Sequence, residues 1–206
     1  MNVSEALRTR ISADHYDASY TLDEQAIQEL VSLALEAPSS FNIQHVRLVA
    51  VTDPAVKKAL RAVSYNQPKV EGASAVFVLF GDMLAHEAFA ERVRGAVAEG
   101  SMPEGTGNYL MNTTKQAFAD PIRAREEAVR SAGLMGMALM LAAQERGLLS
   151  GPMIGFSPAG VNEVLGAAAR YQPLLMVVVG RAAPGNAPRK PRLGLDVALR
   201  MNKADF

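Results

Sequence analysis

The chain contains no cysteine in its 206 residues. This absence excludes disulfide bonds, thiolate nucleophiles and the usual cysteine-based zinc and iron–sulfur sites. The three histidines, His15, His45 and His86, are far apart in the sequence and fit no metal-ligand spacing. We therefore expect no metal site, and we expect each histidine to lie at the surface or to serve packing.

Net charge and long apolar segments are absent as well. Twenty-one basic residues balance 21 acidic ones, so nothing suggests a basic surface for nucleic acid or an anionic membrane. The longest apolar segment, residues 132–143, contains two glycines and is shorter than the roughly 18 residues that span a bilayer. The N-terminal residues show no apolar signal core. We expect a cytoplasmic protein that binds neither nucleic acid nor membranes.

Several nucleotide-binding and catalytic motifs are also missing. There is no Gly-x-x-x-x-Gly-Lys-Ser/Thr loop. Gly105-Thr106-Gly107 lacks both the third glycine and the preceding strand of a dinucleotide-binding motif. No Gly-x-Ser-x-Gly motif is present, and no pair of carboxylates stands out. Hydrolytic chemistry therefore has no candidate residues, and we expect no catalytic triad or dyad.

The apolar pattern predicts strands that alternate with helices. Thr21 and Glu24 resemble a capping box that opens a helix reaching about Glu36. The expected strands are residues 46–51, 75–80 and 174–179, and the expected helices are residues 3–10, 21–36, 53–63, 87–99, 121–146 and 157–165. A chain of this length can build one full core. The order indicates an α+β or α/β fold in one domain, residues 1–206.

Two segments have no clear pattern. Residues 100–112 contain three glycines and a proline, which predicts a long loop of the functional or mobile kind. The tail from residue 181 to residue 206 carries proline, basic residues and then a brief helical pattern. It has too few apolar residues to bury itself. We expect it to pack on the body of the protein or on a second subunit.

A polar segment, residues 38–44, separates the second expected helix from the first strand. Ser39, Ser40, Asn42 and Gln44 are short neutral hydrogen-bonding side chains. Such groups, displayed on a loop between rigid elements, can read the edge of a planar polar ring. The alternative is a helix stop followed by an ordinary polar turn.

Basic and hydroxyl side chains far apart in the sequence could form a phosphate site. Arg10 and Ser12 follow the first expected helix, and Lys190 and Arg192 lie in the tail. Guanidinium groups bind a dianion in bidentate fashion, lysine adds a point charge, and a hydroxyl fills a remaining lone pair. The alternative for the Lys190-Pro191-Arg192 segment is solvated charge.

Taken together, five segments resemble the FMN-dependent nitroreductase family over nearly the whole chain. Residues 10–17 look like its N-terminal Arg-Arg-Ser-x-Arg-x-Phe/Tyr-Asp signature. Residues 37–44 match its Ala-Pro-Ser-x-x-Asn-x-Gln loop position by position. Residues 66–69 match an Asn/Gln-containing turn before a core strand, and residues 152–156 match a Gly-Phe turn. Lys190-Pro191-Arg192 matches the basic motif after the last core strand.

The resemblance implies an α+β fold with a central mixed or antiparallel β-sheet flanked by helices. It implies an interlocked homodimer with two FMN molecules at the interface. Exchange of a C-terminal arm, about residues 181–206, between the subunits is also implied.

The resemblance further implies roles for individual residues. Arg10, Ser12, Lys190 and Arg192 would hold the FMN phosphate, whereas Asn66 and Lys69 would face the pyrimidine side of the flavin. Asn42 and Gln44 would lie near the ribityl chain or the ring. Ser39 and Ser40 would come from the partner subunit. Main-chain groups of the 152–155 turn would line the ring, with one amide toward flavin N5. The cofactor-binding residues implied are Arg10, Ile11, Ser12, Asp14, Ser39, Ser40, Asn42, Gln44, Asn66, Lys69, Pro152, Met153, Ile154, Gly155, Lys190 and Arg192.

The implied reaction is ping-pong transfer of hydride from NAD(P)H through flavin N5 to a nitroaromatic, a quinone or a similar electrophile, with no catalytic side chain. Phe41, Tyr109 and Phe118 are candidates for lining the substrate pocket. Ile11 and Asp14 depart from the signature, which has basic or polar residues there. A carboxylate at position 14 would either oppose charge on a reduced ring or turn to solvent and leave Lys69 as the main cation. A flavin-binding storage or sensor protein with little turnover is therefore the alternative.

Overall fold

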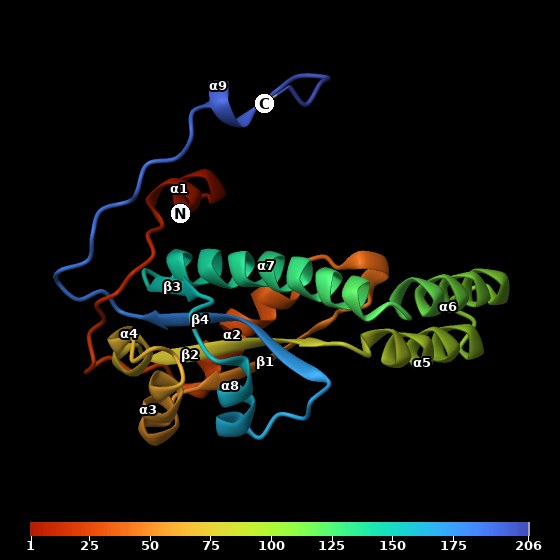
Figure 1. Ribbon diagram of the computed structural model, residues 1–206, viewed down its shortest axis with the longest axis horizontal. Coiled ribbons are helices and arrows are strands. Elements are labelled where there is room, and N and C mark those ends of the chain that lie inside the picture. The colour runs from red at the N-terminus through yellow and green to blue at the C-terminus, as the bar shows by residue number, and fades with distance from the viewer. Residues whose placement is uncertain (206) are drawn as a thin grey trace.

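The computed structural model describes residues 1–205, which form helices packed on both faces of one sheet (Figure 1). The strands are β1 (Val46–Val51), β2 (Ala75–Asp82), β3 (Leu149–Met153) and β4 (Tyr171–Gly180). The helices are α1 (Val3–Thr9), α2 (Glu24–Leu35), η1 (Ser40–Asn42), α3 (Pro54–Ala62), α4 (Pro68–Gly72), α5 (Ala85–Ala98), α6 (Glu104–Phe118), α7 (Pro121–Glu145), α8 (Pro158–Leu165) and α9 (Leu195–Ala198). The fold is α+β.

All strand pairs in the sheet are antiparallel, in the order β1-β2-β4-β3. Every residue of β2 is buried, because this strand is central and helices cover both of its faces. Successive side chains of a strand point to opposite faces. Ala75, Phe77 and Leu79 accordingly join one apolar core, whereas Val76 and Val78 join the other.

The two cores define the layers on either side of the sheet. The first core packs α2 and α7 against the sheet, with Leu30 and Leu139 fully buried. The second core packs α3, α4 and α8 on the opposite face, through Leu60, Val70 and Val161. The long helix α7 lies along the sheet in Figure 1, and its leucine, methionine and alanine side chains join the first core.

Residues 100–112 do not form the predicted long loop. Most of them belong to α6, which packs beside α5 as a helical hairpin extending from the sheet (Figure 1). A Cβ atom at Gly107 would lie 2.6 Å from a methyl group of Val97 on α5. This glycine therefore allows two helices to approach closely. From sequence alone, a glycine that packs against a neighbouring helix cannot be distinguished from a glycine in a loop. The prediction of a loop was wrong for this reason.

Helix α2 begins later than the capping-box pattern predicted. Asp23, not Thr21, is the N-cap, and its carboxylate accepts a hydrogen bond of 2.8 Å from the Ala26 amide. An aspartate at the N-cap also interacts favourably with the positive end of the helix dipole. The predicted helix over residues 121–146 is confirmed as α7, and Gly147, which follows its C-cap Arg146, adopts a φ of 71°.

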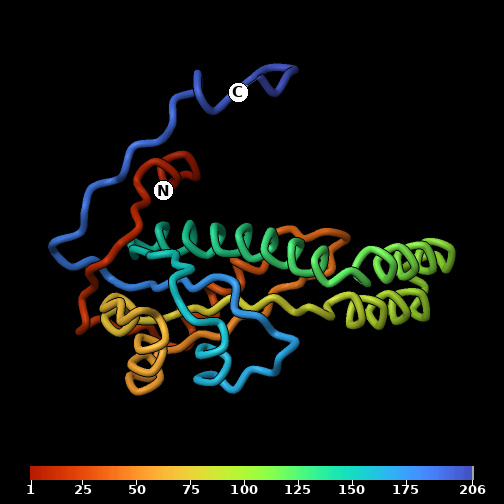
Figure 2. Tube along the Cα trace, in the orientation of Figure 1, coloured from red at the N-terminus to blue at the C-terminus, as the bar shows by residue number. Residues whose placement is uncertain are grey.

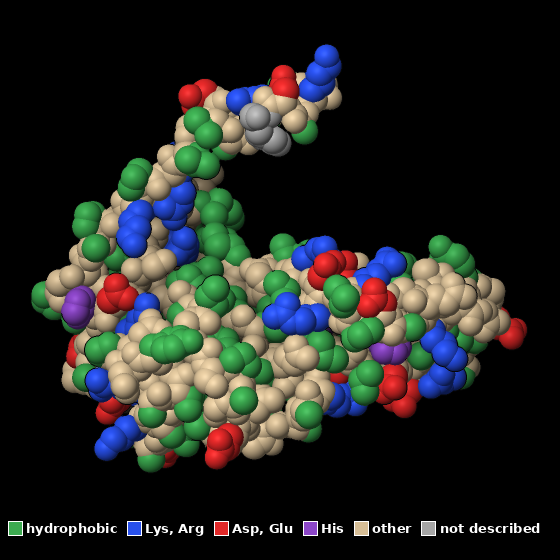
Figure 3. All heavy atoms as spheres, in the orientation of Figure 1, with side chains coloured by type: hydrophobic (Ala, Val, Ile, Leu, Met, Phe, Trp, Pro, Cys, Tyr) green, Lys and Arg blue, Asp and Glu red, His purple; other side chains and the backbone are tan. Residues whose placement is uncertain are grey.

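The C-terminal segment leaves the body after β4 and extends past α1 (Figures 1 and 2). Its apolar side chains are largely exposed, namely Leu193, Leu195, Val197, Leu199 and Met201. Figure 3 shows this arm standing clear of the body. No helix within residues 1–205 is both long and apolar enough to cross a membrane.

Candidate functional site

A cavity of about 250 Å³ brings together three segments that are remote in the sequence. The first follows α1, the second is the start of α4, and the third is the beginning of the C-terminal arm. The lining residues are Arg10, Ile11, Ser12, Asp14, Lys69, Ala187, Pro188, Arg189, Lys190 and Arg192. This set contains all four residues of the predicted phosphate site. We call it the basic cavity.

Strand β3 positions the first wall of the basic cavity. The Ala13 amide donates a hydrogen bond of 3.0 Å to the Ser150 carbonyl, and Ser12 forms a bridge with Ser150. Gly151 permits this approach, because a Cβ atom there would lie 2.7 Å from the Ala13 carbonyl oxygen. The segment is therefore fixed to the sheet, although it belongs to no named strand.

Asn186 ties the first wall to the C-terminal arm. Its side-chain oxygen accepts hydrogen bonds from the Asp14 amide (2.8 Å) and the His15 amide (3.0 Å). Its side-chain nitrogen donates to the His15 and Ala183 carbonyls at 2.7 and 3.0 Å. The sequence predictions missed Asn186, because a single asparagine in a tail carries no pattern.

Positive charge accumulates at the arm side of the basic cavity. Burial lowers the pKa of Arg10, and repulsion from Arg192 and Arg189 lowers it further. The Arg10 Nε is buried without a hydrogen-bond partner in the described chain. Unsatisfied donors and like charges gathered at one place suit a bound dianion. These residues therefore fit the phosphate group of FMN. Arg189 was not among the predicted site residues, although it adjoins the basic motif.

Lys69 forms an ion pair with Asp14 in the same cavity. The Lys69 Nζ lies 2.9 Å from the Asp14 Oδ1. The Lys69 side chain is 16% exposed, whereas that of Asp14 is 64% exposed. Neither sequence alternative for Asp14 describes this arrangement. Because the Asp14 carboxylate pairs with Lys69, it neutralises the Lys69 charge, and Lys69 is not an isolated cation.

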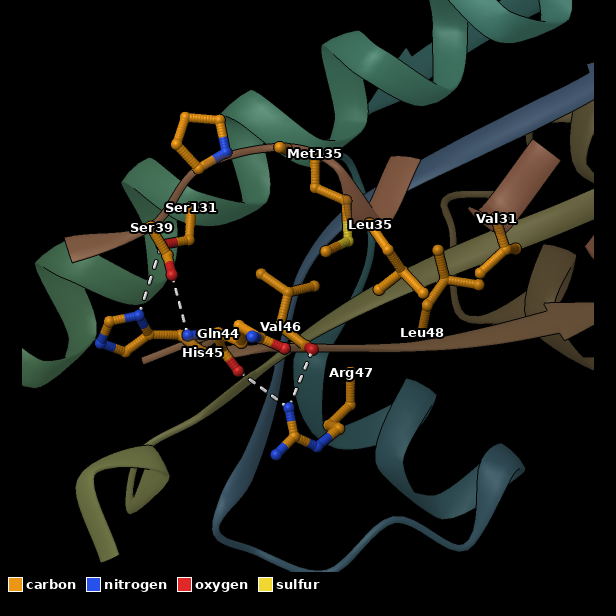
Figure 4. Close-up of a pocket in the computed structure, with 12 residues that line it drawn as sticks. Val31, Leu35, Ser39, Gln44, His45, Val46, Arg47, Leu48, Ser131 and Met135 are labelled. Carbon is orange, nitrogen blue, oxygen red and sulfur yellow. Dashed lines mark hydrogen bonds between the residues drawn. The ribbon is translucent and has the colours of Figure 1, made fainter. Parts of the chain in front are cut away.

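The two ends of the polar loop, residues 38–44, line a separate cavity of about 270 Å³ between α2, β1 and α7, through Pro38, Ser39 and Gln44 (Figure 4). The Ser39 hydroxyl accepts a hydrogen bond of 2.8 Å from the Gln44 amide, and the Gln44 side chain donates to Asn42 at 3.3 Å. Phe41, Asn42 and Gln44 all have positive φ angles between 54° and 57°. Such angles are uncommon outside glycine, and for a bulky aromatic residue they indicate a strained backbone.

The turn after β3 lies beside the segment that precedes α4. The Gln67 side-chain nitrogen donates a hydrogen bond of 2.9 Å to the Gly155 carbonyl. A Cβ atom at Gly155 would lie 3.1 Å from this nitrogen. Pro152 is half-buried, the Met153 side chain joins the second core, and Ile154 is exposed. Met153 can therefore present only its main chain to a ligand. Asn66 has a φ of 54°.

The three aromatic candidates for a substrate pocket have different surroundings. Phe41 and Tyr109 are exposed, the latter on α6. Phe118 is only 4% exposed and joins the apolar core between α5, α6 and α7. Its ring packs on His45 and His86 at centroid distances of 5.3 and 6.3 Å. Phe118 therefore fills the core in this chain rather than lining an open pocket.

His45 is a buried polar residue next to the polar loop. It is 2% exposed, and its Nδ1 lies 3.4 Å from the Ser131 hydroxyl on α7 (Figure 4). Burial lowers its pKa, so the ring is neutral near pH 7. Its Nε2 has no partner within the described part of the chain.

Residues 1–205 contain no cluster of three or more potential metal ligands.

Comparison with known proteins identifies the class of protein to which this fold and this cavity belong. The family model described as "Nitroreductase family" matches residues 7–181. The chain therefore belongs to the nitroreductase family, as the sequence motifs indicated.

Individual relatives extend this result. The chain is 30% identical over 185 residues to MhqN of Bacillus subtilis, which is named as a candidate NAD(P)H nitroreductase. The alignment covers 89% of each of the two proteins. It is 32% identical over 171 residues to the NADH dehydrogenase of Thermus thermophilus, with 80% of each covered. A candidate nitroreductase from Exiguobacterium sibiricum, solved in complex with FMN, superposes with a TM-score of 0.88 at 25% identity and 98% coverage of both chains.

Proposed function

We propose that this protein is an FMN-dependent NAD(P)H oxidoreductase that reduces nitroaromatics, quinones or similar electrophiles. The observation that carries the proposal is the basic cavity, which brings together Arg10, Ser12, Lys190 and Arg192. The positive charges of its arginines lie close enough to repel one another. Membership of the nitroreductase family supports it, as does the FMN complex of the Exiguobacterium protein. Bound FMN would accept reducing equivalents from NAD(P)H and pass them to the electrophile in a ping-pong cycle.

The chain's own residues would bind and orient the cofactor. Arg10, Lys190 and Arg192 would clasp the phosphate with charge-assisted hydrogen bonds, and the Ser12 hydroxyl would complete the shell. Lys69 and Asn66 would border the pyrimidine edge of the ring. Pro152 in β3 and Ile154 and Gly155 in the turn after it would line the ring with main-chain groups. No side chain is assigned a proton-transfer role.

We also propose a cytoplasmic homodimer in which each chain forms one domain, residues 1–206, with an arm from about residue 181. Within the arm, exposed apolar side chains occupy alternate positions from Leu193 to Met201. Water contact with so many apolar groups is unfavourable, and a second copy would remove it. Ser39 lines a different cavity from the basic cavity, which supports the proposal that Ser39 and Ser40 reach the flavin from the partner subunit. Asn42 and Gln44 would lie near the ribityl chain or the ring.

Reduction of the purified protein tests the proposed function. After reconstitution with FMN, the protein should be yellow, NAD(P)H should bleach it without oxygen, and a quinone or a nitroaromatic compound should restore the colour. Comparison of NADH with NADPH identifies the donor. A protein that stays colourless after reconstitution would contradict the proposal.

A flavin storage or sensor protein is the second candidate. The Asp14–Lys69 ion pair favours it, because it removes a free positive charge that would stabilise a reduced ring. In this case the protein binds FMN but NAD(P)H does not bleach it at a useful rate. Stopped-flow absorbance near 450 nm under anaerobic conditions separates the two functions.

A further inference from the structure

The charged groups of the basic cavity fall into two sets. Arg10, Lys190 and Arg192 have no carboxylate within ion-pair distance among residues 1–205. Lys69 is instead paired with Asp14. The cavity therefore presents a strongly positive part beside the arm and a nearly neutral part at Lys69.

The position of Asp14 is set by its neighbours and not by its charge alone. The Asp14 and His15 amides both donate to the Asn186 side chain, and the preceding residue, Ala13, is hydrogen-bonded to Ser150 on β3. The backbone on either side of the carboxylate is therefore anchored. An exposed ion pair is usually weak because both side chains lose freedom on pairing. Here the backbone anchors and the largely buried Lys69 stem reduce that entropic cost.

We propose that Asp14 determines which charge distribution the basic cavity selects in its ligand. With Asp14 present, the cavity favours a ligand that has one anionic end and a neutral ring. A ligand whose ring carries a second negative charge binds less well. This inference rests on the proposed function. Applied to FMN, Arg10, Lys190 and Arg192 would hold the phosphate, and the Asp14–Lys69 pair would border the ring. Reduction adds negative charge to the pyrimidine side of the ring, and Asp14 cancels the cation that would stabilise it. Asp14 therefore holds the reduction potential of bound FMN low.

The substitution Asp14→Asn tests this role. It leaves the backbone anchors in place and releases Lys69, whose positive charge then faces the cavity with little hydration. The ratio of the dissociation constants of oxidised and reduced FMN should rise about tenfold. For a two-electron couple this corresponds to an increase of about 30 mV in the potential of bound FMN. The potential is measured by anaerobic reduction with dithionite against a reference dye, so the readout does not depend on turnover.

Two further variants separate a local effect from a general one. Asp17→Asn removes the same charge three residues away, where the carboxylate faces Arg181 and lies outside the basic cavity. It should leave the potential within a few millivolts of wild type. In a Lys69→Met background, Asp14→Asn should no longer raise the potential, because the cation that it would release is absent. Thermal denaturation of each variant reports on folding.

Three results would overturn the inference. They are an unchanged potential in Asp14→Asn, an equal rise in Asp17→Asn, or a rise that persists with Met at position 69. Any of these can occur in a protein that binds FMN and turns over, so the proposed function would survive. Failure of the wild-type protein to bind FMN would instead contradict the proposed function itself.

Discussion

Arg192 is the residue in which the phosphate assignment can be tested most directly. Its guanidinium donates to the Lys190 carbonyl at 2.8 Å and contributes to the repulsion that lowers the pKa of Arg10. We expect Arg192→Ala to weaken FMN binding about ten- to a hundredfold, since a hydrogen bond to a charged group contributes about 1.5–3 kcal/mol. Isothermal titration of the apoprotein with FMN measures this change.

Two controls complete that titration. Arg123→Ala removes an exposed guanidinium at the start of α7, outside the basic cavity, and should leave FMN affinity unchanged. Riboflavin, which lacks the phosphate, should bind wild type and Arg192→Ala equally. Unchanged FMN affinity in Arg192→Ala would show that the phosphate lies elsewhere.

His45 predicts a pH dependence of stability. Burial lowers its pKa in the folded state below the usual 6.5. The unfolded chain therefore takes up a proton first as the pH falls through 6.5, and the folded state loses stability until its own pKa is reached. The loss approaches about 1.4 kcal/mol per pH unit within that window. Above pH 7 both states are neutral, and this contribution to the pH dependence vanishes.

Urea denaturation of wild type and His45→Gln between pH 5 and pH 8 tests this expectation. Glutamine cannot titrate but keeps a hydrogen-bonding side chain next to Ser131. The difference in unfolding free energy between the two proteins should shift in favour of the variant below pH 6.5. Parallel pH profiles would mean that His45 does not titrate differently in the two states.

At the scale of elements, the contact between β3 and the segment after α1 is central to the site. Gly151→Ala would place a methyl group 2.7 Å from the Ala13 carbonyl oxygen and 3.0 Å from the Tyr16 hydroxyl. We expect a loss of about 1–3 kcal/mol in unfolding free energy, as for overpacking in other cores. FMN binding should weaken as well, because Ser12 and Asp14 lie on the displaced segment.

A second glycine provides the control for this substitution. Gly95 lies in the middle of α5 and is exposed, and no atom is within 4 Å of a Cβ atom built there. Gly95→Ala should stabilise the protein by up to about 1 kcal/mol, because alanine has the higher helix propensity. Chemical denaturation of both variants gives the comparison. A neutral Gly151→Ala would show that the segment moves away without cost.

At the scale of the whole molecule, the arm is the feature that a single chain leaves unexplained. A chain ending at Arg192 would keep the basic cavity and lose the exposed apolar positions. We expect this truncated protein to sediment as a monomer and to bind FMN weakly, since the polar loop could no longer come from a partner. Sedimentation velocity measures the assembly state.

Changing side chains without shortening the chain separates arm length from arm chemistry. The triple variant Leu195→Ser, Val197→Ser and Leu199→Ser keeps every backbone group. It should also be monomeric if apolar burial holds the subunits together. A dimer of unchanged stability in both proteins would exclude the arm as the interface.

Local pattern was sufficient for much of the fold. The predicted strands over residues 46–51, 75–80 and 174–179 became β1, β2 and β4, and the predicted helix over residues 121–146 became α7. The sequence missed β3 and α4, which are short and each contain a proline. It also misread α6, because a glycine that packs on a neighbouring helix looks like a loop glycine when the neighbour is unknown.

The family follows from the sequence alone, because motifs such as residues 37–44 keep their residue types and spacing wherever they lie in space. Only the tertiary structure decides how the charges meet. Lys69 and Asp14 are 55 positions apart, and their pairing depends on α4 docking beside the segment that β3 holds. Electrostatic energy depends on distance through space and not along the chain. The neutral part of the basic cavity could therefore be recognised only in the folded protein.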